Sequence, residues 1–165
     1  AGQLGNARIF IDDSSSPSLA EIRAKSRRLK RDGNLDLIVI DYLQLLTTKA
    51  ESRQQEISTI SRNLKAIAKD LQVPVLALSQ LNRAAEKRDS HWPMLSDLRE
   101  SGAIEQDADM VMMLFREDYY GETEENAGLS ELILAKNRNG ATGVVHLRFT
   151  KECMRFENAV QVPAL

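Results

Sequence analysis

The feature that most constrains the fold of this chain is an apolar run that ends in one acid, Leu37-Ile38-Val39-Ile40-Asp41. A continuous apolar run of this length predicts a strand buried on both faces, as in a parallel sheet covered by helices. Ligands of open α/β sheets bind at the carboxyl ends of the strands, so Asp41 lies where a carboxylate can hold the Mg²⁺ of a nucleotide. The sequence contains no Gly-x-x-x-x-Gly-Lys-Ser/Thr motif to bind phosphates. It therefore holds the metal half of an ATP site and lacks the phosphate half.

Composition limits the class of protein before any motif is weighed. With 165 residues, of which 42% are hydrophobic and 28% charged, the chain has the size and balance of one soluble globular domain. The lone cysteine, Cys153, cannot form an intramolecular disulfide, and no apolar stretch approaches the roughly 20 residues that span a bilayer. We therefore expect a cytoplasmic protein without membrane contact. A net charge of −2 means that any contact with nucleic acid must be local.

Hydrophobic periodicity predicts alternating strands and helices along the first part of the chain. The strands are expected at residues 8–11, 37–40, 73–78 and 110–115. The last two are expected to be buried, with Met110, Met112 and Met113 in the core. One helix is expected to begin at a capping box, Ser18 with Glu21, and to end at Gly33. A second helix covers residues 55–71, with these apolar residues at helical spacing: Ile57, Ile60, Leu64, Ile67 and Leu71.

The pattern changes in the second half of the chain to that of an antiparallel hairpin. An apolar run at 132–135 is followed by a turn at Asn139-Gly140 and by alternating residues at 145–149. We expect this hairpin at the edge of the sheet. The acidic stretch 117–128 is predicted to be an exposed loop, and the basic residues between 23 and 31 to form a solvated helix face.

These elements together predict one α/β domain over residues 1–165. Its sheet is expected to be mostly parallel, with right-handed crossovers and a C-terminal antiparallel hairpin. Asp41 and Gln80 would then follow two strands at the same edge of the sheet, which suggests one ligand site. The alternative is that each is only a polar residue where a strand reaches the surface.

Four motifs give this site a specific context. They are Ile38-Val39-Ile40-Asp41-Tyr42-Leu43-Gln44-Leu45, Ala77-Leu78-Ser79-Gln80-Leu81-Asn82-Arg83, Ser96-Asp97-Leu98-Arg99-Glu100-Ser101-Gly102 with Ile104-Glu105-Gln106-Asp107-Ala108-Asp109, and Ala135-Lys136-Asn137-Arg138-Asn139-Gly140. In content and order they resemble bacterial replicative DNA helicases of the DnaB family. The resemblance implies a RecA-like P-loop ATPase core whose P-loop strand is missing from this chain. We therefore expect a gap in the middle of the sheet.

The resemblance implies roles for four residues at the nucleotide, ATP. Asp41 matches the Walker B aspartate, which holds Mg²⁺ through the water shell of the ion. Gln80 matches a sensor glutamine that contacts the γ-phosphate or its attacking water. Lys136 and Arg138 match a pair that acts on the nucleotide of the adjacent subunit, with Arg138 as the arginine finger. Spaced i and i+2 in a strand, both cations are expected to point to the same side. Spacing alone would equally suit two solvated cations on an edge strand.

Contact with single-stranded DNA is also implied by the resemblance. The residues that match the DNA-binding loop of the family are Arg99, Glu100 and Gly102, and Arg83 in the preceding loop is also assigned to this contact. A translocating motor must accept any base, so contacts with the phosphate backbone are sufficient. Arg83, Lys87 and Arg88 in the preceding loop either add to the positive channel or are ordinary loop charges. Trp92 is expected to anchor the loop by packing and not to stack on a base.

The implied function is ATP-dependent unwinding of duplex DNA at the replication fork by a homo-hexameric ring, with primase and a helicase loader as partners. The phosphate loop and the catalytic glutamate of the family lie upstream of this segment, so we expect the 165 residues alone to be inactive. Two alternatives remain: a RecA/RadA-like repair or recombination ATPase, which shares the Lys-Asn-Arg-x-Gly string at 136–140, and a non-catalytic interaction fragment.

Overall fold

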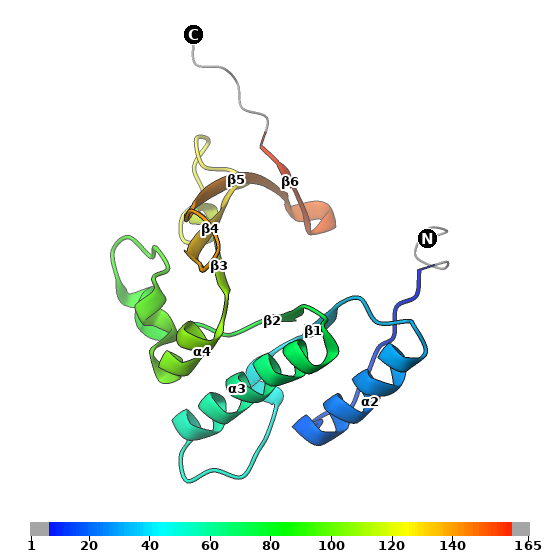
Figure 1. The fold of residues 1–165 in the computed structure, drawn as a ribbon. Helices are drawn as coiled ribbons and strands as arrows, with labels where there is room; N and C mark the ends of the chain where they lie inside the picture. Colours follow the sequence, from blue (N-terminus) through cyan, green and yellow to red (C-terminus); the bar gives the residue numbers. More distant parts are fainter. Residues whose placement is uncertain (1–6, 160–165) are drawn as a thin grey trace. The chain divides into compact units, whose positions relative to one another are not determined.

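The computed structural model describes residues 7–159, with the side chains of residues 84 and 99–101 left outside the description. The chain divides into two compact units, Ala1–Gln80 and Leu81–Leu165, and each is described by itself. Among the described residues, no helix has the length and apolar character needed to cross a membrane. Figure 1 shows helices α2 and α3 in the first unit and the strands β3–β6 in the second.

The first helix of the first unit, α2, covers Leu19–Arg31 and begins as predicted. The Ser18 hydroxyl accepts a hydrogen bond from the Glu21 amide, and the Glu21 carboxylate accepts one from the Ser18 amide, so two amides at the helix start are satisfied. Gly33 follows the helix end with φ +71°, a conformation that glycine adopts at little cost. Ser26 is the one buried residue of α2, so the basic residues form a solvated face as expected.

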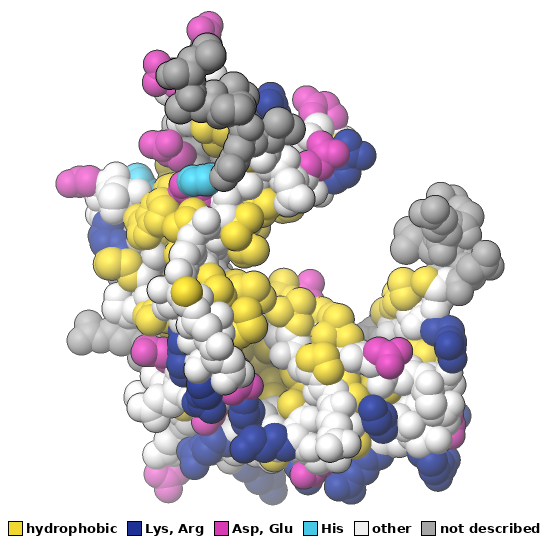
Figure 2. All heavy atoms as spheres, turned by 45° about the horizontal axis from the view of Figure 1, so that its top comes forward, with side chains coloured by type: hydrophobic (Ala, Val, Ile, Leu, Met, Phe, Trp, Pro, Cys, Tyr) yellow, Lys and Arg dark blue, Asp and Glu magenta, His cyan; other side chains and the backbone are white. Residues whose placement is uncertain are grey.

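Helix α3 covers Arg53–Leu71 and confirms the clearest helical pattern in the sequence. Its five apolar residues at helical spacing are all buried. The helix packs against β2 (Val75–Ala77), which pairs in parallel with β1 (Ile38–Ile40). The side chains of Val39 and Leu76 on these strands remain exposed, so the strands expected to be buried are covered on one face only within the described residues. Figure 2 shows hydrophobic side chains gathered on the surface of the molecule.

The prediction of a strand at residues 8–11 is wrong. This segment is irregular, and the side chains of Ile9, Phe10 and Ile11 are exposed. A strand is stable only when a neighbouring strand satisfies its amides and carbonyls, and no strand in the described part of the chain pairs with this segment.

The second unit is built on a four-stranded antiparallel sheet in the order β3-β4-β5-β6. The strands are β3 (Met110–Phe115), β4 (Leu129–Asn137), β5 (Gly143–Thr150) and β6 (Arg155–Asn158). The predicted hairpin is confirmed as β4 and β5, but it lies inside the sheet because β6 forms the edge. Before the sheet come the 3₁₀ segments η2 (Arg83–Lys87) and η3 (Leu95–Ser101) and the short helix α4 (Gly102–Asp107).

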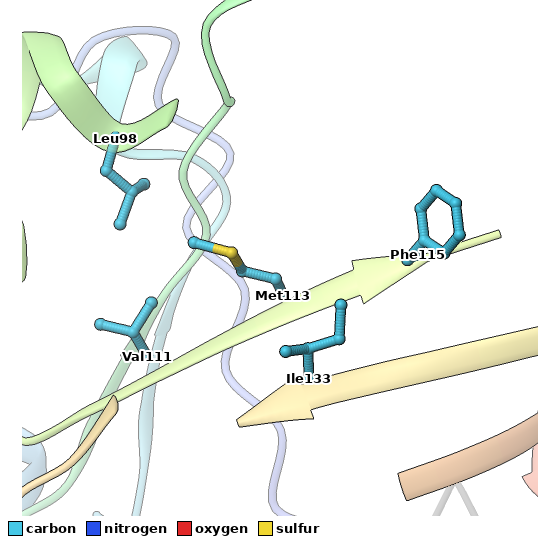
Figure 3. Packing of buried hydrophobic residues seen from close by; sticks show 5 residues of the cluster. All are labelled: Leu98, Val111, Met113, Phe115 and Ile133. Atoms are coloured by element: carbon cyan, nitrogen blue, oxygen red, sulfur yellow. The ribbon is translucent and has the colours of Figure 1, made fainter. Parts of the chain in front are cut away.

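Alternate side chains of β3 are buried, which corrects the expectation of a strand buried on both faces. Val111, Met113 and Phe115 pack with Leu98 of η3 and Ile133 of β4 (Figure 3). Met110, Met112 and Leu114 are exposed. The prediction that Met110 and Met112 belong to the core is therefore wrong. An antiparallel strand with one covered face alternates in this way, and a run of apolar residues alone does not reveal which face is covered.

The acidic loop at residues 117–128 is more ordered than a plain exposed loop. It contains the 3₁₀ turn η4 (Glu117–Tyr119), and the side chains of Asp118 and Asn126 are buried. Arg116 donates two hydrogen bonds of 3.1 Å to Asp118, which hold the pKa of this carboxyl below its usual value despite its burial. Asn126 donates to the Gly121 carbonyl at 2.9 Å and so closes the loop on itself.

The described strands form two separate sheets, in which β2 and β3 are not hydrogen-bonded neighbours. The expected gap in the middle of a single sheet stays a prediction. Among the described strands only β1 and β2 pair in parallel, so the prediction of a mostly parallel sheet is not met within the described residues.

Candidate functional site

Asp41 directly follows β1, and its side chain is exposed. The register of the parallel pair places Ile40 opposite Ala77, the last residue of β2, so both strands end at the same edge. The Leu78 amide donates to the Ile40 carbonyl at 2.9 Å, and the Leu43 amide donates to the Leu78 carbonyl at 2.9 Å. These bonds extend the pairing past both strand ends and hold the segment after Asp41 against the segment that leads to Gln80.

Gln80 lies beyond β2 and is held by Gln44, a residue to which the sequence analysis gave no role. The Gln44 side chain donates to the Ser79 hydroxyl at 3.2 Å and to the Gln80 carbonyl at 3.4 Å. Its amide oxygen accepts from the Gln80 N–H at 3.4 Å. A single amide therefore bridges the loops after both strands and fixes the backbone of Gln80 while the Gln80 side chain stays exposed. The sequence offered one signal for Gln44, namely its position in the motif that contains Asp41.

The loop after β1 is tied to the start of α3. Arg53 donates to the Gln44 carbonyl at 2.7 Å and forms an ion pair with Glu56. The Thr48 amide donates to Glu56 at 2.9 Å, and this bond is the main cause that lowers the pKa of the Glu56 carboxyl. The Asp41 edge of the sheet is thus braced by a helix terminus.

Lys136 and Arg138 lie at the end of β4, and both reach the end of α4. Lys136 Nζ donates to the carbonyl of Glu105 and, at 3.5 Å, to that of Gln106. Arg138 Nη2 donates to the same Gln106 carbonyl at 3.0 Å, and Nη1 lies 3.3 Å from the carboxylate of Asp109. Because both cations reach one carbonyl oxygen, they point to the same side, as predicted from their spacing. Their role toward a nucleotide stays a prediction.

Local backbone features set the position of this pair. The register between β3 and β4 shifts between Val111 and Met112, which face Lys136 and Leu134, so β4 has one extra residue just before Lys136. A bulge of this kind changes the direction of the side chains that follow. After the strand, the Asn137 side chain donates to the Ala141 carbonyl at 3.2 Å and accepts from the Asn139 amide at 3.2 Å. The turn is thus closed by the side chain of Asn137.

Arg88 has a structural partner, Asp97, that no sequence pattern indicated. Its guanidinium makes two hydrogen bonds, of 2.9 and 2.5 Å, to the buried carboxylate of Asp97 and one of 2.8 Å to the Trp92 carbonyl. Burial alone would raise the pKa of Asp97, but the bonds from Arg88 and from the Met94 amide outweigh it and leave the pKa below its usual value. Arg88 therefore holds the loop together.

The remaining predicted residues are placed as follows. Arg83 is exposed at the start of η2, and Gly102 is exposed at the start of α4. The side chains of Arg99 and Glu100 lie outside the described residues. Trp92 packs against Phe115, with ring centroids 5.2 Å apart, and so anchors the loop as expected. The described residues contain no group of three or more His, Cys, Asp or Glu side chains suited to hold a metal ion.

Comparison with known proteins identifies the family to which the chain belongs. Residues 1–158 match the family model of the DnaB-like helicase C-terminal domain. The chain is 55% identical over 160 residues to the replicative DNA helicase DnaB of Geobacillus stearothermophilus, covering 95% of this chain and 35% of the relative. It is 54% identical to the replicative DNA helicase DnaC of Bacillus subtilis, with the same coverage of both chains.

Solved structures give the same result for the fold. A DnaB-like replicative helicase, described with its interactions with primase, superimposes with a TM-score of 0.91 at 47% identity over 96% of this chain and 40% of the other. A solved structure of an ATPase domain superimposes with a TM-score of 0.92 at 47% identity over 96% of this chain and 57% of the other. The chain thus spans about a third of the curated relatives that it matches. It belongs to the family of DnaB-like helicase C-terminal domains.

Proposed function

We propose that this chain is part of the ATP-driven motor of a hexameric replicative helicase, which unwinds duplex DNA as it moves along one strand. The observation that carries the proposal is the presence of two separate pairs of polar residues, which follow each other along the chain in the same order as the motifs of the family. Asp41 and Gln80 follow strands that end at one sheet edge, and Lys136 and Arg138 share one side of the hairpin. A ring of identical subunits brings the first site of one subunit next to the second site of its neighbour.

Asp41 suits the Mg²⁺ of ATP. An exposed carboxylate at a strand end fits a cation that keeps several waters and needs only one or two protein carboxylates beside the phosphates. The ion supplies charge neutralisation on the transferred phosphoryl group when it is bound. We assign to Asp41 the task of positioning it.

Gln80 is proposed as the residue that senses the γ-phosphate. Its exposed amide side chain can donate to a phosphate oxygen or orient a water, while Gln44 fixes its backbone. Gln80 is also the last residue before Leu81–Leu165, the unit that holds the proposed DNA contacts. The residue proposed to sense the nucleotide is therefore adjacent in sequence to the segment proposed to bind DNA.

Lys136 and Arg138 are proposed to stabilise negative charge on the nucleotide of the adjacent subunit. A guanidinium suits this task because it is planar, always charged and has five N–H donors. Removing such an arginine typically lowers the rate by about 10³- to 10⁵-fold. Lys136 adds a second positive charge on the same side.

Contacts with single-stranded DNA are proposed for Arg83, Arg99, Glu100 and Gly102. Exposed basic and main-chain groups can bind phosphates without regard to base sequence. Primase and a helicase loader are proposed as partners and the cytoplasm as the location, because the relatives are replicative helicases and one of them is described with primase.

A subunit-mixing experiment tests the action across the interface. Full-length Asp41→Ala and Arg138→Ala proteins should each lose DNA-stimulated ATPase activity. When the two are mixed into common rings, about one interface in four combines an intact Asp41 with an intact Arg138 from the neighbour. We expect activity to return on mixing.

Failure to recover activity on mixing, with mixed rings verified, would place both residues in one subunit and contradict the proposal. Full activity of Arg138→Ala alone would favour the non-catalytic alternative. Unwinding of a forked duplex in the 5′ to 3′ direction separates a replicative helicase from a repair ATPase. The 165-residue chain by itself should hydrolyse no ATP.

A further inference from the structure

The end of helix α4 receives hydrogen bonds from both proposed trans-acting cations. Two carbonyls there, of Glu105 and Gln106, accept from Lys136 and Arg138, and Asp109 forms an ion pair with Arg138. The Arg138 amide also donates to the Asp109 carbonyl at 2.8 Å. Backbone and side chain of Arg138 are therefore both held by the same residue.

The chemistry of this region suits cations. The last carbonyls of a helix have no partner within the helix, and the negative end of the helix dipole lies there. Asp109 adds a full negative charge just beyond α4. Lysine and arginine side chains have many rotamers, so an unheld pair would spend little time in one position.

We propose that the end of α4 is a cradle that positions Lys136 and Arg138 for catalysis, with Asp109 as its positioning residue. This inference rests on the proposed function of the pair. Half of the Arg138 side chain is exposed, so the guanidinium can meet a phosphate while Asp109 and Gln106 hold it. Helix α4 follows η3 without a break, so the cradle is continuous with the segment that contains the proposed DNA contacts.

A contribution to stability does not explain the arrangement. An exposed ion pair typically adds little to the free energy of unfolding. The chain offers a matched control in Arg155 and Glu157 of β6, an ion pair of 2.9 Å and similar exposure, away from α4. Loss of either pair should change stability by the same small amount.

The test uses the full-length hexamer, with ssDNA-stimulated ATPase as the readout. We expect Asp109→Ala to lower kcat by about ten- to a hundredfold, because small misplacements of a catalytic group have effects of this size. The KM for ATP should change little, since the loss falls on the transition state. Asp109→Asn, which has the same shape, should show a smaller loss, Asp109→Glu should recover most of the activity, and Glu157→Gln should behave as wild type.

A double-mutant cycle separates positioning from a structural effect. In an Arg138→Ala background, Asp109→Ala should lower kcat no further, because the group that it positions is already absent. An unchanged or raised kcat in Asp109→Ala, or additive losses in the cycle, would overturn the inference. A wild-type rate in Arg138→Ala would instead refute the proposed function of the finger, so the two failures are distinguishable. Size-exclusion chromatography and the Asp109→Asn variant guard against loss of folding.

Discussion

Replacement of Asp97 by asparagine should destabilise the second unit strongly. The Asp97 side chain is 5% exposed, and its carboxylate accepts two bonds from Arg88 and one of 2.7 Å from the Met94 amide. Asp97→Asn keeps the shape but loses the charge and turns an N–H group toward the guanidinium. Breaking a buried pair costs about 3–5 kcal/mol, but Arg88 is 29% exposed and partly screened, so we expect a loss of about 2–4 kcal/mol.

The assay is urea unfolding followed by the fluorescence of Trp92, the only tryptophan of the chain. Trp92 packs in the same core, and its carbonyl accepts a bond from Arg88, so its emission reports the relevant unit. Glu157→Gln, which breaks the exposed pair with Arg155, is the control and should cost at most about 1 kcal/mol. If both variants lose the same amount, Asp97 and Arg88 do not act as a buried pair.

The loss should also depend on pH in a defined direction. The pKa of Asp97 is lowered in the folded chain, so its charge adds stability above the unfolded pKa of about 4. That contribution is lost as the pH falls through the folded pKa. The difference between wild type and Asp97→Asn should therefore be constant from about pH 7 to 5 and shrink in more acidic solution. A difference that does not shrink there would refute the ionic explanation.

Three further substitutions test single features of the fold. Gly128→Ala should lower the free energy of unfolding by about 2–4 kcal/mol, because φ is +71° and the new Cβ would lie 2.8 Å from a backbone carbonyl oxygen. The control is Gly121→Ala, whose Cβ meets nothing within 4 Å and which should be nearly neutral in the same unfolding assay. Ser18→Ala removes the cap of α2 and should cost about 1 kcal/mol, seen as faster amide exchange in its first turn. Gln44→Ala should speed hydrogen exchange at the Gln80 amide about three- to tenfold while distant amides are unchanged.

Local patterns in the sequence predicted the regular elements well. The apolar spacing of α3 and the capping box at Ser18 depend on residues within one or two helical turns, so the sequence contains all the information needed. The hairpin of β4 and β5 is equally local, because its strands are joined by one short turn. The segment at residues 8–11 failed because strand formation depends on a partner that local sequence does not show.

The site could be predicted only as a set of positions and not as contacts. The Gln44 amide meets Gln80 across 36 residues, and Arg138 meets Asp109 across 29. No periodic pattern in the sequence indicates either contact, because each depends on how two distant elements pack against each other. Motif resemblance located the residues at the strand ends, while the residues that hold them emerged only from the fold.

The exposed apolar strands finally connect the sequence pattern with the proposed motor. Residues of a parallel sheet are normally covered on both faces, yet Leu37, Val39, Leu76 and Leu78 are 41–55% exposed beside a helix that covers one face only. The apolar run that ends in Asp41 thus has the composition of a strand in a more complete sheet. Because the curated relatives are about three times as long as this chain, we expect the rest of the full-length protein to supply the covering strand and helices. The same segment would bring the phosphate loop to the edge where Asp41 and Gln80 lie, since that edge is where ligands of such sheets bind.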